Sequence, residues 1–145
     1  KLYVFKMDND YRAGAVSDII KVNDDSITKF FTNQNSYQEY DAIAGEHYLK
    51  ISSVKASVWQ KQAQLKALCL LEQTGESQTQ ITSINPTKLV GGLFPVTITG
   101  TTRRYKAAKF DFIMEMLNSI ECRLVKFGTD MDDFAKRIES LAKAL

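Results

Sequence analysis

The sequence predicts a single α+β domain over residues 1–145, in which an antiparallel sheet from the N-terminal half is covered by two or three helices. Three observations support this class. Short alternating apolar and polar runs fill residues 1–53, helix-forming residues dominate residues 54–72, and the chain ends in an amphipathic stretch. A chain of 145 residues, 44% of them hydrophobic, can bury a core without disulfides or metals.

The first 53 residues predict a β meander of about five short strands. β-forming side chains fill short runs that turn-forming residues separate. In chain order, the expected strands and apolar patches are residues 2–5, residues 19–22, the group Ile27, Phe30 and Phe31, residues 37–40 and residues 47–53. The expected turns are residues 8–10, Gly14, residues 23–25, residues 33–36 and the hairpin turn around Gly45.

Residues 54–72 predict the first helix. They are rich in Ala, Gln, Lys and Leu, contain no Gly or Pro, and are followed by Gly75, where a helix would end. A strand remains possible for the continuous apolar run 68–71, because periodicity does not resolve such a run. The helix is the preferred interpretation.

Residues 80–84 and 95–99 predict two strands of a second small sheet region. Asn85-Pro86 and Gly91-Gly92 lie between them and predict a loop. A phosphate-binding turn is the less favoured interpretation of Gly91-Gly92, because the Lys-Ser/Thr of a P-loop and a GxGxxG pattern are both missing.

Residues 105–118 fit two periods. Phe110 and Leu117 fit one face of a helix, whereas the apolar residues at alternate positions from 108 to 116 fit a strand. Arg103 and Arg104 weaken the helix interpretation, because they would lie at the positive end of a helix dipole. We nevertheless predict a helix here.

The last segment predicts a terminal amphipathic helix. Thr129 or Asp130 can cap it, acidic residues follow at once and basic residues come later. Its apolar positions repeat at helical spacing at Phe134, Ile138, Leu141 and Leu145. We expect this helix to pack on its own sheet rather than on a partner.

The sequence predicts no catalytic, cofactor-binding or metal-binding residue, and so no enzyme. His47 is the one histidine, and a lone histidine beside a tyrosine on a strand is usually structural. Cys69 and Cys122 are most simply two buried thiols, although one disulfide is possible in an oxidising compartment. A catalytic alternative would require His47 to lie close to Cys69 or Cys122.

Two groups of residues are candidates for an interaction surface. The first consists of tyrosines that an exposed sheet edge would present to a partner strand: Tyr37, Tyr40 and Tyr48. Packing in the sheet's own core is the favoured interpretation of any one of these aromatics. The second is a basic cluster with Tyr105 and Phe110 interleaved, which suits nucleic acid or an anionic lipid surface: Arg103, Arg104, Lys106 and Lys109. A solvated rim is its simpler interpretation.

Residues 2–51 resemble a group of small uncharacterised bacterial envelope domains, many of them lipoproteins, related in pattern to PEGA-type β modules. The resemblance rests on the order of residues 2–6, Gly14, residues 20–24, residues 35–37 and residues 44–47. The sequence departs from that pattern at Asp24, at Gln34-Asn35 and at Ala44, where Gly, Asn-Gly and Pro are usual. The resemblance implies a non-enzymatic role at the cell envelope and transfers no catalytic residue.

We therefore expect a non-enzymatic, envelope-associated accessory or interaction module that binds another protein through a sheet edge or a helix face. The alternative is a binder of nucleic acid or an anionic surface through the basic cluster. We expect a periplasmic or envelope-anchored location, with the true N-terminus removed upstream of Lys1. No apolar run in the sequence approaches the roughly 18 residues that a membrane span requires.

Overall fold

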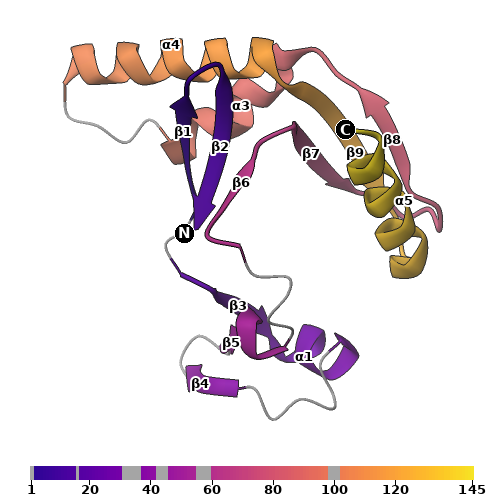
Figure 1. The fold of residues 1–145 in the computed structure, drawn as a ribbon. Coiled ribbons are helices and arrows are strands. Elements are labelled where there is room, and N and C mark those ends of the chain that lie inside the picture. Colours follow the sequence, from indigo (N-terminus) through magenta and orange to yellow (C-terminus); the bar gives the residue numbers. More distant parts are fainter. Residues whose placement is uncertain (1, 16, 31–36, 42–45, 55–59, 98–101) are drawn as a thin grey trace. The chain divides into compact units, whose positions relative to one another are not determined.

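The computed structural model describes residues 2–15, 17–30, 37–41, 46–54, 60–97 and 102–145 (Figure 1). Its helices and sheets confirm the predicted α+β class. The chain divides into two compact units, Lys1–Gln64 and Leu65–Leu145, where the sequence predicted one domain with a change of texture after residue 53. The described strands form three separate three-stranded sheets rather than one.

In the first unit, strands β1 (Leu2–Met7) and β2 (Asp10–Ala15) form an antiparallel hairpin, and β6 (Gln62–Gln64) pairs with the other edge of β2. The hairpin turn contains Asp8 with a φ of 56°, a left-handed conformation that Asp tolerates. The sequence predicted only turns at residues 8–10 and 14. Residues 10–15 instead form β2, which buries Tyr11.

The second sheet of this unit has the order β3 (Ile19–Asn23), β5 (Glu46–Lys50), β4 (Tyr37–Asp41), all antiparallel. The predicted hairpin of residues 37–40 and 47–53 is thus confirmed as β4 and β5, although residues 51–54 form the short helix α2 (Ile51–Val54) instead of continuing the strand. Gly45, at its predicted turn, lies outside the described residues.

A helix replaces the turn and strand-like patch predicted at residues 23–30. Helix α1 (Asp24–Phe30) begins directly after β3. The Asn23 side chain accepts a hydrogen bond from the Ser26 backbone N–H at 2.8 Å, and Asp24 and Asp25 occupy the first turn. The prediction was wrong because the same Asn-Asp-Asp chemistry that favours turns also caps helices. Phe31 lies outside the described residues.

In the second unit, the central strand β9 (Glu121–Phe127) pairs in parallel with β7 (Ala67–Gln73) and in antiparallel fashion with β8 (Gln80–Ser83). Strand β8 confirms the prediction for residues 80–84. The helix predicted over residues 54–72 is wrong from residue 62 onward, where the chain forms β6 and β7 instead. Pairing with distant strands overrides the helix propensity of these residues. Strand β9 was not predicted.

Three helices complete the second unit. Helix α3 (Pro86–Thr97) replaces the loop and strand predicted at residues 85–97. The Asn85 side chain accepts hydrogen bonds from the backbone N–H and the hydroxyl of Thr87, and Pro86 takes the first helical position, where its missing N–H costs nothing. Helices α4 (Arg103–Ser119) and α5 (Met131–Ala144) confirm the two later helix predictions, with Asp130 as the cap of α5.

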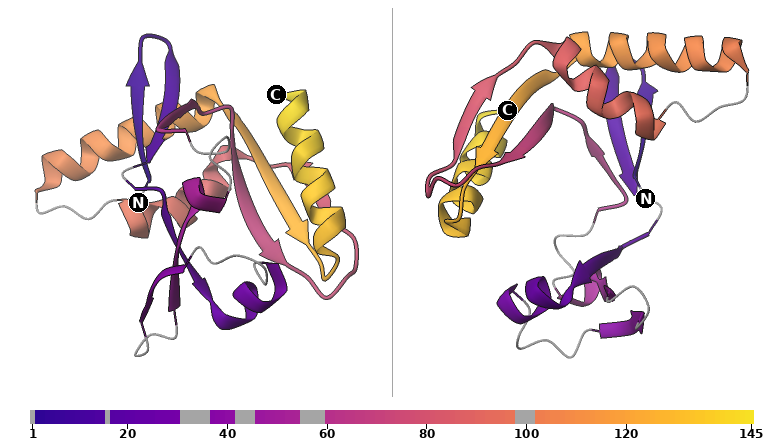
Figure 2. Two further views of the ribbon diagram at one scale, coloured as in Figure 1. Left: turned by 60° about the horizontal axis from the view of Figure 1, so that its bottom comes forward. Right: turned by 180° about the vertical axis from the view of Figure 1, so that it is seen from behind.

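The core of the second unit lies where α4 meets α3 and β9. Leu117 on α4 and Val125 on β9 are fully buried, and Ile113, Met116 and Leu89 are nearly so. All the buried residues of α4 lie in its second half, near the point where the helix leads into β9. The N-terminal end of α4 points away from the sheet (Figures 1 and 2).

Candidate interaction surface

The predicted basic cluster lies in the first two turns of α4. We call residues 103–110 the basic half of α4. Thr102 caps the helix: its hydroxyl accepts a hydrogen bond from the Tyr105 backbone N–H at 3.3 Å, and its carbonyl oxygen accepts one from the Lys106 N–H at 3.1 Å. The cap therefore starts the helix immediately before the cluster.

One face of α4 is buried in its second half and exposed in the basic half. Tyr105, Lys109 and Ile113 follow one another at intervals of four residues, and so lie along the same face. Ile113 is buried, whereas Tyr105 is 49% exposed and Lys109 is half-buried. Lys106 and Phe110 lie beside this row, and both are exposed. The helix thus extends its core-facing side beyond the core of its own unit.

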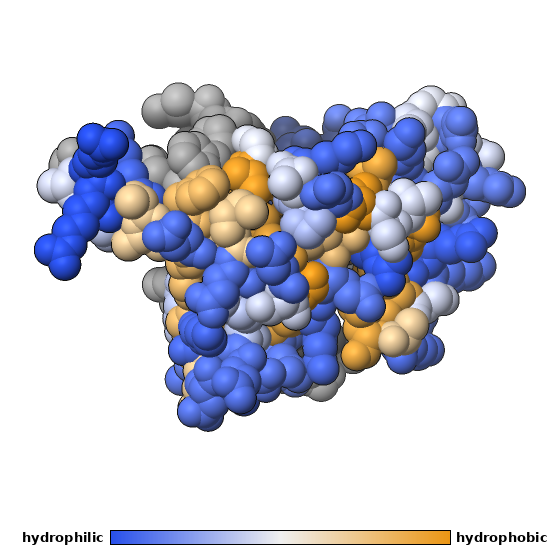
Figure 3. Space-filling model, turned by 90° about the horizontal axis from the view of Figure 1, so that it is seen from above, coloured by the Kyte–Doolittle hydropathy of each residue, from blue (hydrophilic) through white to orange (hydrophobic). Residues whose placement is uncertain are grey.

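The exposed end of this helix is strongly basic. Arg103, Arg104 and Lys106 are exposed, and the Lys109 ammonium lies 4.6 Å from the centre of the Tyr105 ring, a cation–π contact. Figure 3, which views the molecule from the side of α4, shows hydrophilic side chains projecting at this end.

The charges of the basic half oppose the dipole of their own helix. Helix α5 shows the favourable order, with Asp132 and Asp133 in its first turn and Lys143 in its last. In α4 the first turn holds Arg103 and Arg104 and no acidic residue. The charges of this first turn therefore weaken the helix rather than stabilise it.

The tyrosines of the other predicted surface belong to the first unit. Tyr37 and Tyr40 lie on β4, and their side chains are outside the described part of the structure. Tyr48 lies on β5 and is half-buried, with the Lys21 ammonium 5.2 Å from the centre of its ring. The two predicted groups are therefore separate features, one in each unit.

Two side-chain pairs in the first unit connect β5 with its neighbours α1 and β3. His47 on β5 pairs with Asp24 at the start of α1, and Lys21 on β3 forms an ion pair of 2.7 Å with Glu46 on β5. The hydrogen bond to Glu46 raises the pKa of Lys21. These pairs place His47 in a structural contact between β5 and α1. It belongs to the first unit, whereas Cys69 and Cys122 belong to the second.

The two cysteines are free thiols on the neighbouring strands β7 and β9. Cys122 is buried and Cys69 is half-buried, and for each of them burial raises the pKa of the thiol. A raised pKa keeps a thiol protonated and weakly nucleophilic near neutral pH. Both residues therefore fit the interpretation as small packing side chains.

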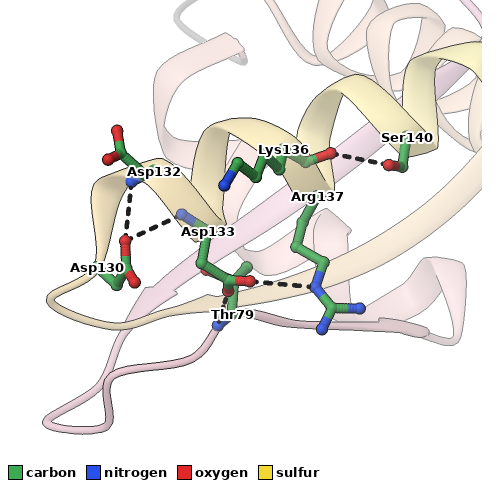
Figure 4. A network of polar contacts seen from close by, with 7 residues as sticks. All are labelled: Thr79, Asp130, Asp132, Asp133, Lys136, Arg137 and Ser140. Atoms are coloured by element: carbon green, nitrogen blue, oxygen red, sulfur yellow. Dashed lines mark hydrogen bonds and ion pairs between the residues drawn. The ribbon is translucent and has the colours of Figure 1, made fainter.

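A polar network fastens the start of α5 to the loop between β7 and β8 (Figure 4). The Asp130 side chain accepts hydrogen bonds from the backbone N–H groups of Asp132 and Asp133. The Asp133 carboxylate accepts a hydrogen bond of 2.7 Å from the backbone N–H of the buried Thr79. This bond, together with the Arg137 guanidinium, lowers the pKa of Asp133. The network is structural, and the Phe127 and Phe134 rings, 5.4 Å apart, pack beside it.

Among the described residues, no group of three or more His, Cys, Asp or Glu side chains could hold a metal ion. None of the described helices is both long enough and apolar enough to cross a membrane. Comparison with family models, with curated proteins and with solved structures found no match.

Proposed function

We propose that this protein is a non-enzymatic interaction module and that it binds a partner protein through the basic half of α4. The observation that carries this proposal is the continuity of one helix face. The row that is buried at Ile113 and Leu117 continues toward the start of the helix through the half-buried Lys109 to the exposed Tyr105. An exposed continuation of a core-facing row is the kind of surface that a second molecule covers.

The side chains of the basic half suit a protein interface. Tyr105 is 49% and Phe110 is 39% exposed, and aromatic residues supply much of the binding energy at protein interfaces. Arginine is another residue type that interfaces favour, and Arg103 and Arg104 precede Tyr105 in the first turn of α4. Eight helical residues span about 12 Å, enough to contact two turns of a partner helix.

The same proposal places the protein at the bacterial cell envelope, on the resemblance of residues 2–51 to envelope domains. This part is tested by reading the gene upstream of Lys1. We expect it to encode a signal peptide or a lipidation cysteine. A complete gene without either would overturn the envelope location and leave the binding surface to be judged separately.

The binding surface is tested by photo-crosslinking in the cells that express the protein. A photoreactive phenylalanine analogue replaces Tyr105, and a second version carries it at Leu71 on β7, which is similarly exposed at 54%. We expect position 105 to trap one defined protein that position 71 does not trap.

The trapped protein is then purified and its affinity measured against Tyr105→Ala/Phe110→Ala and against Leu71→Ala. The double variant should weaken binding at least roughly tenfold, as expected for aromatic anchors, while Leu71→Ala should not. Circular dichroism checks that both variants stay folded. Equal affinities for the natural chain and both variants would refute the proposed surface.

A further inference from the structure

Strand β7 forms a long and regular edge of the sheet in the second unit. It pairs on one side with β9, and no other described strand pairs with it (Figure 1). Its register against β9 is unbroken, it contains no proline, and the stretch Ala67–Leu71 carries no charge. Native sheets usually protect their edges with charges, prolines or bulges, so an apolar edge of this length indicates a pairing site.

The hydrogen bonds at the two ends of β7 show which of its backbone groups face the free edge. The Lys66 carbonyl oxygen accepts the Glu121 N–H at 3.1 Å, and the Thr74 N–H donates to the Phe127 carbonyl oxygen at 2.8 Å. The backbone polar groups of successive strand residues point to opposite sides. Even-numbered residues from 66 to 74 therefore bond to β9, whereas the N–H and C=O groups of residues 67, 69, 71 and 73 face the edge.

The charges at the two ends of this edge match a second copy of the same strand. Lys66 lies three residues before Cys69, Glu72 lies three residues after it, and both charged side chains are exposed. When two copies of β7 run antiparallel with Cys69 opposite Cys69, each Lys66 therefore lies opposite the Glu72 of the other copy. No other antiparallel alignment of the two strands achieves this, because only Cys69 lies midway between the two charges.

The apolar side chains between these charges also fit one another. In the same alignment Leu68 lies opposite Leu70, and the small side chain of Ala67 lies opposite Leu71, which is 54% exposed. Ala67, Cys69 and Leu71 present their N–H and C=O groups to the edge, so they exchange backbone hydrogen bonds across the pair. The cross-strand pairs are thus apolar in the middle and oppositely charged at both ends.

We infer that β7 is the interface of a homodimer, in which two copies of the chain join their sheets through an antiparallel β7–β7 pair centred on Cys69. The same residues serve on both sides of a two-fold axis. A second copy always supplies the matching charges, whereas a strand of another protein would need them at the same spacing. A single strand edge is a small interface, so we expect a dissociation constant of about 1 μM or weaker. The inference does not depend on the basic half of α4.

The natural chain provides the first test. Sedimentation velocity from about 1 μM to about 1 mM should show a monomer that converts to a dimer. Hydrogen exchange resolved to single residues should slow with dimerisation at Cys69 and Leu71, and change little at Leu68 and Leu70, whose N–H groups already bond to β9. A monomer at every concentration would overturn the inference. So would a dimer in which exchange at Cys69 and Leu71 stays the same.

Exchanging the charges tests the alignment. Glu72→Lys gives each edge two cations and Lys66→Glu gives it two anions, so each variant alone should dimerise at least roughly tenfold more weakly. Mixed in equal amounts, the two variants should form a heterodimer, because opposite charges again face each other at both ends. The controls, Asp111→Lys and Lys88→Glu, change the net charge equally at exposed helix positions and should dimerise like the natural chain.

The mixture also separates effects between chains from effects within one chain. Glu72 lies beside Lys126 on β9, so Glu72→Lys adds repulsion inside its own sheet, and this repulsion persists in the mixture. Circular dichroism checks the fold of each variant, and hydrogen exchange of the natural chain decides the question if one of them unfolds. Undiminished dimerisation of the single variants, or a mixture of folded variants that does not recover, would overturn the inference. In the photo-crosslinking experiment, position 71 should trap a second copy of this chain.

Discussion

The ring of Tyr3 on β1 lies across Gly14, its antiparallel partner on β2. A methyl group on Gly14 would overlap the Cζ atom of Tyr3 and lie 2.6 Å from its hydroxyl oxygen. Tyr3 also stacks on Phe5, with ring centres 5.6 Å apart. Because Gly14 has no side chain, the exposed Tyr3 ring packs directly on the backbone of the hairpin.

Gly14→Ala should displace the Tyr3 ring without unfolding the hairpin. Because Tyr3 is 44% exposed, its ring can rotate into solvent, and we expect the free energy of unfolding to change by less than about 1 kcal/mol. In NMR spectra of the natural chain, the ring should shift the chemical shifts of the Gly14 α protons. This ring-current shift should be missing from a variant without the ring. Tyr3→Ala is the control for that shift. A loss of several kcal/mol in Gly14→Ala would show that the ring cannot move.

Gly128→Ala should destabilise the second unit far more. Here the added methyl group would overlap the carbonyl oxygen of Glu76 and lie 2.7 Å from its carbonyl carbon. That carbonyl accepts the Thr129 N–H at 3.0 Å, so backbone has to shift and a hydrogen bond has to lengthen. We expect a loss of roughly 1–3 kcal/mol, measured by urea unfolding.

The matched control is Gly91→Ala in α3, where nothing lies within 4 Å of the new methyl group. Since Gly weakens a helix interior by roughly 0.5–1 kcal/mol relative to Ala, this variant should gain stability. The prediction for Gly128 is wrong if both glycine variants shift stability in the same direction.

The stability of the second unit should fall in acid through Asp133. The Thr79 N–H, with Arg137, lowers the pKa of Asp133 in the folded state, so the folded chain binds this proton more weakly than the unfolded chain does. The stabilisation is therefore present above the ordinary value of 3.8 and disappears as the pH falls below it toward the lower folded pKa.

Asp133→Asn keeps an oxygen that can accept the Thr79 N–H but removes the charge. We expect this variant to show a shallower loss of stability on acidification than the natural chain, in urea titrations across this pH range. Asp132→Asn removes the neighbouring carboxylate in the first turn of α5 and is the control. An unchanged acid profile in Asp133→Asn would contradict the assignment.

Arg103→Glu/Arg104→Glu should raise the stability of the second unit. Replacing cations by anions at the N-terminal end of α4 favours the helix dipole by roughly 0.3–1 kcal/mol per site at low salt. Thermal unfolding should show the gain, and added salt should reduce it. Lys143→Glu should instead lose stability, because Lys143 lies in the last turn of α5, at the negative end of that helix dipole. A stability loss in the α4 variant would mean that the two arginines hold structure rather than a surface.

The elements that could be predicted are those with strong local chemistry. The hairpin of β4 and β5, strand β8 and the helices α4 and α5 all follow from alternation, capping residues or helical spacing. Two of the wrong predictions, at the starts of α1 and α3, share a cause. The Asn-Asp-Asp of residues 23–25 and the Asn-Pro of residues 85–86 fit turns as well as they fit helix starts, and only the packing of the residues after them selects the helix.

The composition of the basic half of α4 was visible in the sequence, but its exposure was not. Arg103, Arg104, Lys106 and Lys109 with their neighbouring aromatics could be a solvated rim, a core edge or a binding surface. The structure shows that the buried residues of α4 are Ile113, Met116 and Leu117, all in its second half. That leaves the first half exposed on the same face.

The sequence by itself determined the α+β class, the cluster of basic and aromatic residues, and the cap that starts α5, because each depends on side chains within a few residues of one another. The tertiary structure decided that residues 67–73 form a strand, since β7 is held by its parallel pairing with the distant strand β9. It also decided which part of α4 is buried. Both outcomes depend on contacts between distant segments, whose energy no local pattern contains.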